Sequence, residues 1–246
     1  MNILMFDFEN GHKSLGSKEG IEDMFNLPVL SPTSWSSFKN TISQLYSLQR
    51  VSCDKVVGSI TIKELENKYV SKQDIDVLIF DTGTELAKKF QRELQGKAKR
   101  LSLPQWGEMK LGLDKLLEMI NRFPANVIFN LHTKLIKDEE LGILKYIPNI
   151  EGSTKEDIGK WFDFVFYTSI VKKDKSRQYV WITARDDRFE QAKDRSGLLD
   201  RIIPQDYSLI YNACEKRGFE NAKVLIIGPP GSGKTRSLQT LLKKGK

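Results

Sequence analysis

The residues with the clearest chemistry in this 246-residue chain form a glycine-rich loop that ends in Lys-Thr. The pattern Gly-x-x-x-x-Gly-Lys-Ser/Thr is met by Gly228-Pro229-Pro230-Gly231-Ser232-Gly233-Lys234-Thr235, with Arg236 directly after it. Such glycines let backbone N–H groups turn toward phosphate oxygens, while the lysine contacts the β- and γ-phosphates and the hydroxyl binds Mg²⁺. This P-loop predicts a site for a nucleoside triphosphate and Mg²⁺, with Thr235 as a metal ligand.

Hydrolysis of such a nucleotide needs two carboxylates, one to hold Mg²⁺ and one to orient the attacking water. Asp81 ends the apolar run Val77–Phe80, which is typical of the metal-binding strand called Walker B. A second strand end carries Asp7 and Glu9, so the residues alone leave Asp7 and Asp81 open as the metal carboxylate. We expect Asp81 to hold the metal and Glu9 to act as the base. Asp7 has the same side-chain parity as Glu9 on an extended strand, so that one would support the other.

The elements that must position these residues alternate between short apolar strands and amphipathic helices. The predicted strands are Asn2–Phe8, Asp76–Phe80, Asn126–Leu131, Phe164–Thr168, Tyr179–Thr183 and Ala222–Ile227. The last of them leads directly into the P-loop. This alternation favours an α/β fold with a mostly parallel sheet that helices cover on both faces.

Helical periodicity and capping residues predict the helices between these strands. They are a helix capped by Ser34 that carries Phe38, Ile42 and Leu45, a helix begun by the capping box of Thr61 and Glu64, and the segments Met109–Arg122, Asp206–Lys216 and Thr235–Lys244.

The composition excludes several classes of protein. Two cysteines and two histidines cannot make a four-ligand zinc site of the usual spacing, and they exclude a disulfide framework. No apolar run approaches the roughly 20 residues that a membrane span requires. We therefore expect a cytoplasmic protein without a membrane partner.

The charge of the chain is positive, with a formal net charge of +7 and a pI near 9.2, which permits a polyanionic partner. Basic residues gather in one stretch, where a single acid, Glu93, opposes Lys88, Lys89, Arg92, Lys97, Lys99 and Arg100. This stretch is either a solvated helix face followed by a loop or a surface that binds phosphates.

Taken together, these residues resemble the RecA-like ATPases, and specifically the small phage nucleotide-binding proteins associated with single-strand annealing and recombination. The resemblance matches Phe6–Gly11 to the family's strand that ends in a water-activating glutamate, which implies that Glu9 is the base. It matches Val77–Gly83 to the Walker B strand and Ile128–His132 to a later strand that ends in a polar sensor, which implies a role for His132. It also points to ATP rather than GTP, with Mg²⁺.

The resemblance extends to a Lys-x-Arg pair, which Lys193 and Arg195 match. By analogy with RecA filaments, these two cations would cross a subunit boundary and stabilise γ-phosphate charge in a neighbour's site, as an arginine finger does. The resemblance thus implies a homo-oligomer, in the form of a filament or ring.

The order of the elements departs from the family, in which the P-loop strand and its helix come first. Here residues 219–246 would supply that first strand, the P-loop and the first helix, and residues 1–218 would supply the remainder of a single RecA-like domain, 1–246. Joining Lys246 to Met1 restores the expected order of helix, basic turn and second strand. We therefore expect a circularly permuted member of the family.

The resemblance also implies that single-stranded DNA is a partner and that a single-strand annealing or binding protein is a further one. It implies a phage protein located in the cytoplasm of its bacterial host. In the family, the DNA-facing loops would match Gln95–Trp106 and Thr133–Thr154. The first contains the DNA-binding candidates Lys97, Lys99, Arg100 and Trp106, which suit phosphate neutralisation and base stacking.

Two other functions use the same P-loop and stay open. One is a small-molecule kinase that transfers phosphate to a nucleotide, although no arginine-rich lid is evident in the sequence. The other is a nucleotide-gated assembly or interaction module without activity on DNA. Turnover of ATP stimulated by single-stranded DNA would separate the recombination protein from both.

Overall fold

The computed structural model describes residues 2–11, 29–54, 75–140, 142–173 and 176–244. The capping box expected at Thr61 and Glu64 lies outside these residues. Among the described helices, none is long and apolar enough to cross a membrane.

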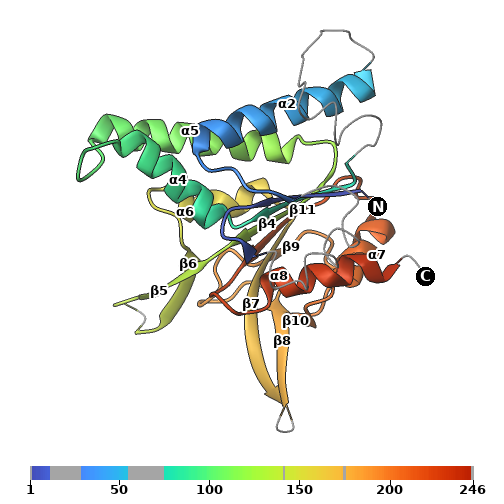
Figure 1. Ribbon diagram of the computed structural model, residues 1–246. Coiled ribbons are helices and arrows are strands. Elements are labelled where there is room, and N and C mark those ends of the chain that lie inside the picture. The colour runs from blue at the N-terminus through green and yellow to red at the C-terminus, as the bar shows by residue number, and fades with distance from the viewer. Residues whose placement is uncertain (1, 12–28, 55–74, 141, 174–175, 245–246) are drawn as a thin grey trace.

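One large mixed sheet runs through the described part of the chain (Figure 1). Its strand order is β10-β8-β7-β11-β4-β3-β1-β2, and β9 pairs with β7. The strands are β1 (Ile3–Asp7), β2 (Val29–Leu30), β3 (Val77–Asp81), β4 (Asn126–Leu131), β7 (Phe164–Lys173), β8 (Ser176–Ile182), β9 (Lys193–Asp194), β10 (Ile202–Pro204) and β11 (Lys223–Ile227). The six from β7 to β2 in this order run parallel, whereas β8 and β9 run antiparallel to β7.

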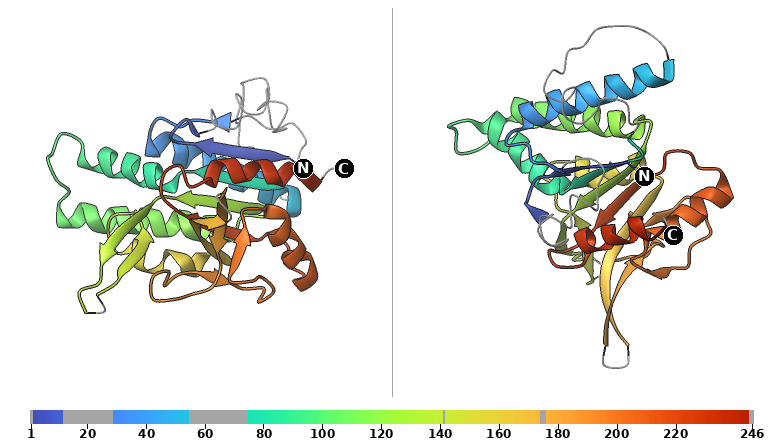
Figure 2. Two further views of the ribbon diagram at one scale, coloured as in Figure 1. Left: turned by 90° about the horizontal axis from the view of Figure 1, so that it is seen from below. Right: turned by 45° about the vertical axis from the view of Figure 1, so that its right-hand side comes forward.

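Helices cover both faces of this sheet (Figures 1 and 2). One face carries α2 (Trp35–Asp54), α4 (Gly83–Gln95), α5 (Leu103–Asn121) and α6 (Thr154–Asp157), which continues into the 3₁₀ helix η2 (Ile158–Trp161). The other carries α7 (Tyr207–Arg217), α8 (Lys234–Ser237) and the 3₁₀ helix η3 (Leu238–Lys244). The predicted α/β fold with a mostly parallel sheet is therefore confirmed.

The burial of the strands explains the two layers. Successive side chains of a strand point to opposite faces. Accordingly Leu78 and Phe80 of β3 join the core under α2, α4 and α5, while Val77 and Ile79 join the core under α7. All five residues of β3 are buried, which is why this strand reads as a continuous apolar run rather than an alternating one.

Most predicted elements lie within a few residues of the observed ones, and the deviations have local causes. The strand Asn126–Leu131 has the predicted bounds. The helix predicted from Met109 begins earlier, at Leu103, because Ser102 and Gln105 form a capping box and Pro104 fits the first turn. The helix predicted over Thr235–Lys244 is α-helical only to Ser237 and then continues as 3₁₀.

The two segments expected as DNA-facing loops differ in structure. The segment Gln95–Trp106 is a short turn, residues 96–102, between α4 and α5, and Trp106 already belongs to α5. The segment Thr133–Thr154 contains a two-stranded hairpin of β5 (Thr133–Lys137) and β6 (Leu144–Pro148). The loop prediction is therefore confirmed for residues 96–102 and was wrong for much of Thr133–Thr154, because cross-strand pairing was not evident from the charge pattern.

A long antiparallel hairpin also projects from the sheet, next to the P-loop. Strand β7 was predicted to end at Thr168 and β8 to begin at Tyr179. Both strands are longer, and their antiparallel pairing continues out to Lys173 and Ser176. We call the part beyond Thr168 and Trp181 the β7–β8 arm (Figure 1). The arm begins just beyond Tyr167, which pairs with Ile227 at the end of β11. It therefore projects from the same edge of the sheet as the P-loop.

The last strand in the chain, β11, lies in the middle of the sheet. It pairs with β4 on one side, with Ile227 opposite Leu131, and with β7 on the other, with Ile227 opposite Tyr167. Because the neighbouring strands are parallel, their carboxyl ends meet at one edge. The P-loop after Ile227 thereby comes to the same edge as the end of β3.

A buried lysine fastens the start of β11. Lys223 is 2% exposed, and its Nζ donates hydrogen bonds to the carbonyl oxygens of Phe123 (2.8 Å), Ala125 (2.7 Å) and Asn221 (2.7 Å). Three donors on the ammonium group thus meet three acceptors. The arrangement ties the turn before β4 to the strand that leads into the P-loop.

We expect Lys223→Met to destabilise the fold by about 2–3 kcal/mol, because it leaves these three carbonyls without their charged donor. Urea unfolding followed by circular dichroism measures the change. Lys216→Met, at an exposed position of α7, is the matched control and should change stability by less than about 0.5 kcal/mol. Equal stability of the two variants would show that the three contacts do not hold β11 in place.

Candidate nucleotide site

The P-loop is shaped by glycines that either have a close neighbour where a Cβ would stand or have a positive φ angle. A Cβ at Gly228 would lie 1.6 Å from Thr168 Oγ1, and Gly231 and Gly233 have φ angles of 73° and 90°. Thr168 donates a hydrogen bond to Ser232 Oγ at 2.7 Å, so β7 supports the loop from one side. From the other side, the N–H of Gly228 donates to the carbonyl of Leu131 on β4.

Lys234 lies inside the loop that it follows. Its side chain is buried, and Nζ donates to the carbonyl oxygens of Gly228 (2.8 Å) and Pro229 (3.0 Å). Burial lowers the pKa of Lys234 to about 8, against the opposing effect of the carboxylates of Asp81 and Glu9. An anion bound in the loop would favour the ammonium form, as a lysine that binds phosphate requires.

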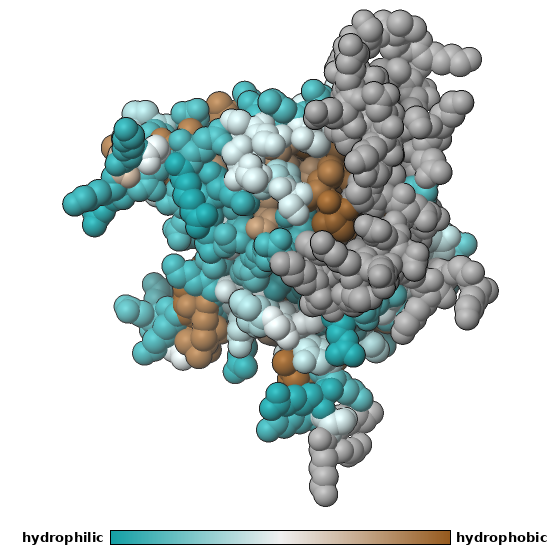
Figure 3. Space-filling model, viewed as in Figure 1, coloured by the Kyte–Doolittle hydropathy of each residue, from teal (hydrophilic) through white to brown (hydrophobic). Residues whose placement is uncertain are grey.

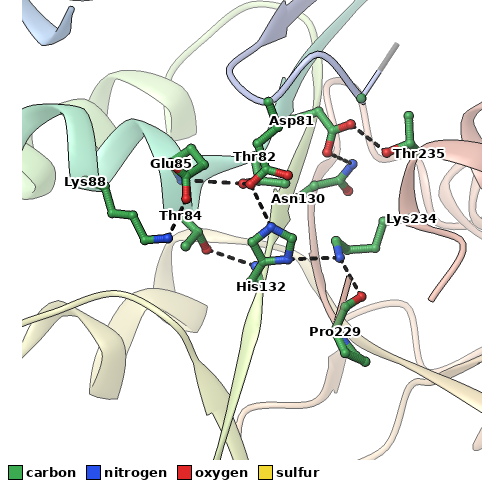
Figure 4. Close-up of polar contacts among 12 residues, drawn as sticks. Asp81, Thr82, Thr84, Glu85, Lys88, Asn130, His132, Pro229, Lys234 and Thr235 are labelled. Atoms are coloured by element: carbon green, nitrogen blue, oxygen red, sulfur yellow. Dashed lines mark hydrogen bonds and ion pairs between the residues drawn. The ribbon is translucent and has the colours of Figure 1, made fainter. Parts of the chain in front are cut away.

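Asp81 connects the end of β3 to the P-loop (Figure 4). Its Oδ2 accepts a hydrogen bond of 2.6 Å from Thr235 Oγ1, and its Oδ1 accepts one of 3.1 Å from Asn130 Nδ2 on β4. Both Asp81 and Asn130 are buried. The hydroxyl predicted as a metal ligand and the carboxylate predicted as Walker B therefore lie in contact, although they are far apart in the sequence.

Asp7 lies beside Asp81 but makes different contacts. The two residues are paired across β1 and β3, and both are buried. Asp7 Oδ1 accepts the N–H groups of Glu9 (3.0 Å) and Gly11 (3.1 Å), so Asp7 shapes the turn that presents Glu9. The geometry thus favours Asp81 over Asp7 as the metal carboxylate and gives Asp7 the supporting position.

Glu9 takes part in a second series of polar contacts at the same edge of the sheet, apart from those of Asp81. Its Oε1 accepts a hydrogen bond of 2.7 Å from Thr82 Oγ1 and lies 2.7 Å from His132 Nε2. The other ring nitrogen of His132, Nδ1, lies 3.4 Å from Lys234 Nζ (Figure 4). A tautomer with the proton on Nε2 satisfies both contacts, because Nε2 then donates to Glu9 and Nδ1 accepts from Lys234.

The two carboxylates have opposite electrostatic environments. Burial raises the pKa of Asp81, and the carboxylate of Asp7 adds to this effect, against hydrogen bonds from Thr235 and Asn130 and the charge of Lys234. Burial also raises the pKa of Glu9, but hydrogen bonds from His132 and Thr82 and the positive charge of Lys234 bring it below its ordinary value. Glu9 is therefore ionised at neutral pH, as a base must be.

The first turn of α4 holds this second series of contacts in place. Thr82, the cap of α4, presents its hydroxyl to Glu9 and also accepts from the N–H of Glu85. Thr84 Oγ1 accepts the backbone N–H of His132 at 2.9 Å. Helix α4 is thus hydrogen-bonded to both Glu9 and the backbone of His132.

The environment of Asp81 and Thr235 fits a magnesium ion. A hydroxyl and a carboxylate oxygen are ligands that Mg²⁺ accepts, and it usually completes its shell with nucleotide phosphates and water. Among the described residues there is no cluster of three or more His, Cys, Asp or Glu side chains that would bind a metal without a nucleotide. A Cβ at Gly11 would lie 2.9 Å from Asp81 Oδ2 and 3.5 Å from Thr235 Oγ1, so glycine at this position keeps the space open.

Lys193 and Arg195 lie away from the site of their own chain. Strand β9 pairs with the start of β7, at the edge of the sheet opposite the P-loop. Lys193 Nζ donates to the carbonyl of Gly159 at 3.0 Å, and the exposed Arg195 forms an ion pair of 2.7 Å with Asp163. The trans role predicted for this pair requires a neighbouring subunit and stays a prediction.

The DNA candidates separate into two environments. Lys97, Lys99 and Arg100 are exposed in the turn between α4 and α5. Trp106 is partly buried, packs against the core and lines a groove of about 410 Å³ with α4 and the segment after β6. The turn therefore offers free cations, whereas Trp106 makes structural contacts as well.

Several residues that complete the site have weaker signals in the sequence. Asn130 was predicted only as part of the sensor strand. Because it lies two residues before His132 at the end of that strand, the two side chains could have been expected on the same face, close to the carboxyl end of the sheet. Thr82 directly follows Asp81, so its hydroxyl could have been included with the Walker B strand. Gly11 carries no local signal, because its importance depends on Asp81 and Thr235, which only the fold brings near.

We expect Gly11→Ala to weaken the binding of Mg²⁺-nucleotide while leaving the fold intact, because the added methyl group pushes the Asp81 carboxylate away from Thr235. Differential scanning fluorimetry measures this as the shift in Tm on adding Mg²⁺ and ATP. The shift should shrink by more than half, consistent with a loss on the order of tenfold in affinity. Gly107→Ala, where a Cβ meets nothing within 4 Å, is the control. An unchanged shift in Gly11→Ala would contradict the placement of the metal.

Comparison with known families gives a match to the AAA domain over residues 1–196. The match contains Glu9, Asp81, Asn130 and His132 and ends before β11 and the P-loop. Comparisons with curated proteins and with solved structures give no match. Since the family match covers well over half of the chain, this protein belongs to the AAA domain family of P-loop ATPases.

Proposed function

We propose that this protein is a RecA-like ATPase that binds single-stranded DNA and acts in phage-type recombination or single-strand annealing. The observation that carries the ATPase part is the meeting of the P-loop with Asp81, Glu9 and His132 at one edge of the sheet. These are the groups that binding and hydrolysis of a nucleoside triphosphate require.

In the proposed mechanism, the P-loop N–H groups and Lys234 bind the β- and γ-phosphates of ATP. Thr235 and Asp81 would hold Mg²⁺, which neutralises phosphate charge when it is bound. Glu9 orients a water molecule toward the γ-phosphate and accepts its proton. His132 contacts both Glu9 and Lys234, so it would keep the base aligned with the phosphates.

The order of the strands supports a circular permutation of the RecA-like domain, 1–246. In the conventional order the P-loop strand precedes the strands that end in Glu9 and Asp81, and here it follows them. It nevertheless lies between β4 and β7, with register maintained on both sides. The family match that stops at residue 196 is consistent with a P-loop unit moved behind the rest. The start of β1 also lies on the side of the molecule where the segment after α8 ends (Figures 1 and 2).

Self-assembly is the second part of the proposal. The described residues around Lys234 include no arginine in contact with the P-loop lysine, and Arg195 is exposed at the opposite edge. A head-to-tail filament or ring would bring Lys193 and Arg195 of one subunit to the site of the next. Exposed Leu135 and Leu144 share one face of the β5–β6 hairpin, and the apolar surface at the lower left of Figure 3, where this hairpin lies, is one that such a contact would cover.

Binding of single-stranded DNA is the third part. The cationic α4–α5 turn supports it, since α4 connects this turn to Thr82 and Thr84, which hold Glu9 and His132. DNA phosphates bound at the turn would therefore act on the element that positions the base. A partner annealing protein would use the same DNA.

We expect Lys234→Ala to abolish ATP turnover and binding, and Glu9→Gln to retain binding while reducing turnover by at least about 10²-fold. A coupled assay of ATP hydrolysis, with and without single-stranded DNA, measures turnover. Glu118→Gln, on the exposed side of α5, is the control and should behave as wild type. Retained turnover in Glu9→Gln would assign the base to another residue, and transfer of phosphate to a nucleoside monophosphate would favour a kinase.

Replacing Lys97, Lys99 and Arg100 with alanine should weaken binding of a single-stranded oligonucleotide and reduce its dependence on salt. If each cation neutralises one phosphate, the slope of log K against log salt should become shallower by about 2. Fluorescence anisotropy over a range of salt concentrations measures it. Alanine at Lys110, Lys115 and Lys216, three exposed lysines elsewhere, removes the same charge as a control. Equal losses in both triple variants would argue against a site at the turn.

A further inference from the structure

A second groove lies on the other side of the P-loop from the carboxylates. It has a volume of about 680 Å³ and is lined by P-loop and helix residues Gly233, Arg236 and Gln239, by Tyr179 of the β7–β8 arm, and by Pro204 and Gln205 after β10. Neither the family match nor the chemistry of hydrolysis assigns this groove a role.

The position of the reacting groups sets the direction of a bound nucleotide. Asp81, Glu9 and His132 belong to the ends of β3, β1 and β4, which lie on one side of β11. These groups surround Lys234 and would take the γ-phosphate end. The groove belongs to β8 and β10, on the opposite side of β11. The part of the nucleotide that follows the α-phosphate must therefore leave the P-loop toward the groove.

The walls of the groove are built around the P-loop backbone. Gln205 Nε2 donates to the carbonyls of Ser232 (3.0 Å) and Val180 (3.2 Å), which fixes its side chain between the loop and β8. A Cβ at Gly233 would lie 3.1 Å from Tyr179 Cδ1 and 2.6 Å from Gln205 Oε1. Glycine here lets the tyrosine ring and the glutamine approach the loop closely.

Tyr179 is placed as a partly open aromatic surface. It stands opposite Ile170 on the arm, two cross-strand pairs beyond the fully buried Trp181, and it is 39% exposed. Arg236, two residues after the P-loop lysine, is exposed at the same groove. An aromatic ring and a guanidinium group are the two side-chain types that stack on planar heteroaromatic rings.

We propose that this groove is the nucleobase subsite, in which the base of the nucleotide stacks on Tyr179 and Arg236 covers its open side. This inference rests on the proposed function, because it requires the phosphates in the P-loop. It assigns the β7–β8 arm a part in nucleotide binding, and it predicts that affinity for ATP exceeds affinity for the inorganic triphosphate that lacks a base.

The test compares ATP with tripolyphosphate, each with Mg²⁺, by isothermal titration calorimetry. Tyr179→Ala should weaken ATP binding about tenfold and leave tripolyphosphate binding unchanged, because stacking is lost and the P-loop is not. Tyr179→Phe keeps the ring and should retain ATP affinity. Arg177→Ala, further out on the same arm and outside the groove, should change neither ligand.

The outcomes separate this inference from the function on which it rests. Equal losses for ATP and tripolyphosphate in Tyr179→Ala would overturn it, since the residue would then act through the shape of the P-loop. Unchanged ATP affinity in Tyr179→Ala, or wild-type protein that binds the two ligands equally, would also overturn it. Wild-type protein that binds neither ligand would instead reject the proposed nucleotide site itself.

Discussion

The site depends above all on the pairing of β11 with strands on both of its edges. An inner strand of a parallel sheet has its N–H and C=O groups engaged on each side, so its register is fixed twice. That fixed register places Ile227 opposite Leu131, and Gly228, the next residue, donates its N–H to the Leu131 carbonyl. Lys223 secures the opposite end of the strand. The P-loop therefore has a defined position relative to every other strand end.

The P-loop in this position meets two series of polar contacts, one through Asp81 and one through Glu9. The two carboxylates differ in their electrostatic environment. Asp81 is buried in the sheet edge, where desolvation and Asp7 raise the pKa of the carboxylate. A cation between Asp81 and Thr235 would relieve this cost. Glu9 stays ionised because His132, Thr82 and Lys234 stabilise its charge. Two carboxylates of similar chemistry are thus suited to different tasks by their surroundings.

The prediction from sequence was accurate where local signals were strong. The P-loop, the apolar run before Asp81, the strand Asn126–Leu131 and the helix predicted over Asp206–Lys216 could all be identified from residue types and spacing. It failed where a segment's structure depends on pairing with another strand rather than on the segment's own residue pattern. The β5–β6 hairpin and the β7–β8 arm lie in stretches of mixed charge, and only cross-strand pairing makes them strands.

The sequence by itself determined the chemistry available to this protein: a loop that binds phosphate, a lysine, a hydroxyl and carboxylates at strand ends. The tertiary structure decided which of these meet. Asp81 rather than Asp7 contacts Thr235, Glu9 contacts His132, and Gly11 leaves room beside them. It also placed Lys193 and Arg195 at the far edge of the sheet. The physical reason is that these contacts join residues up to 154 positions apart, so they depend on strand order and register, which residue spacing along the chain does not encode.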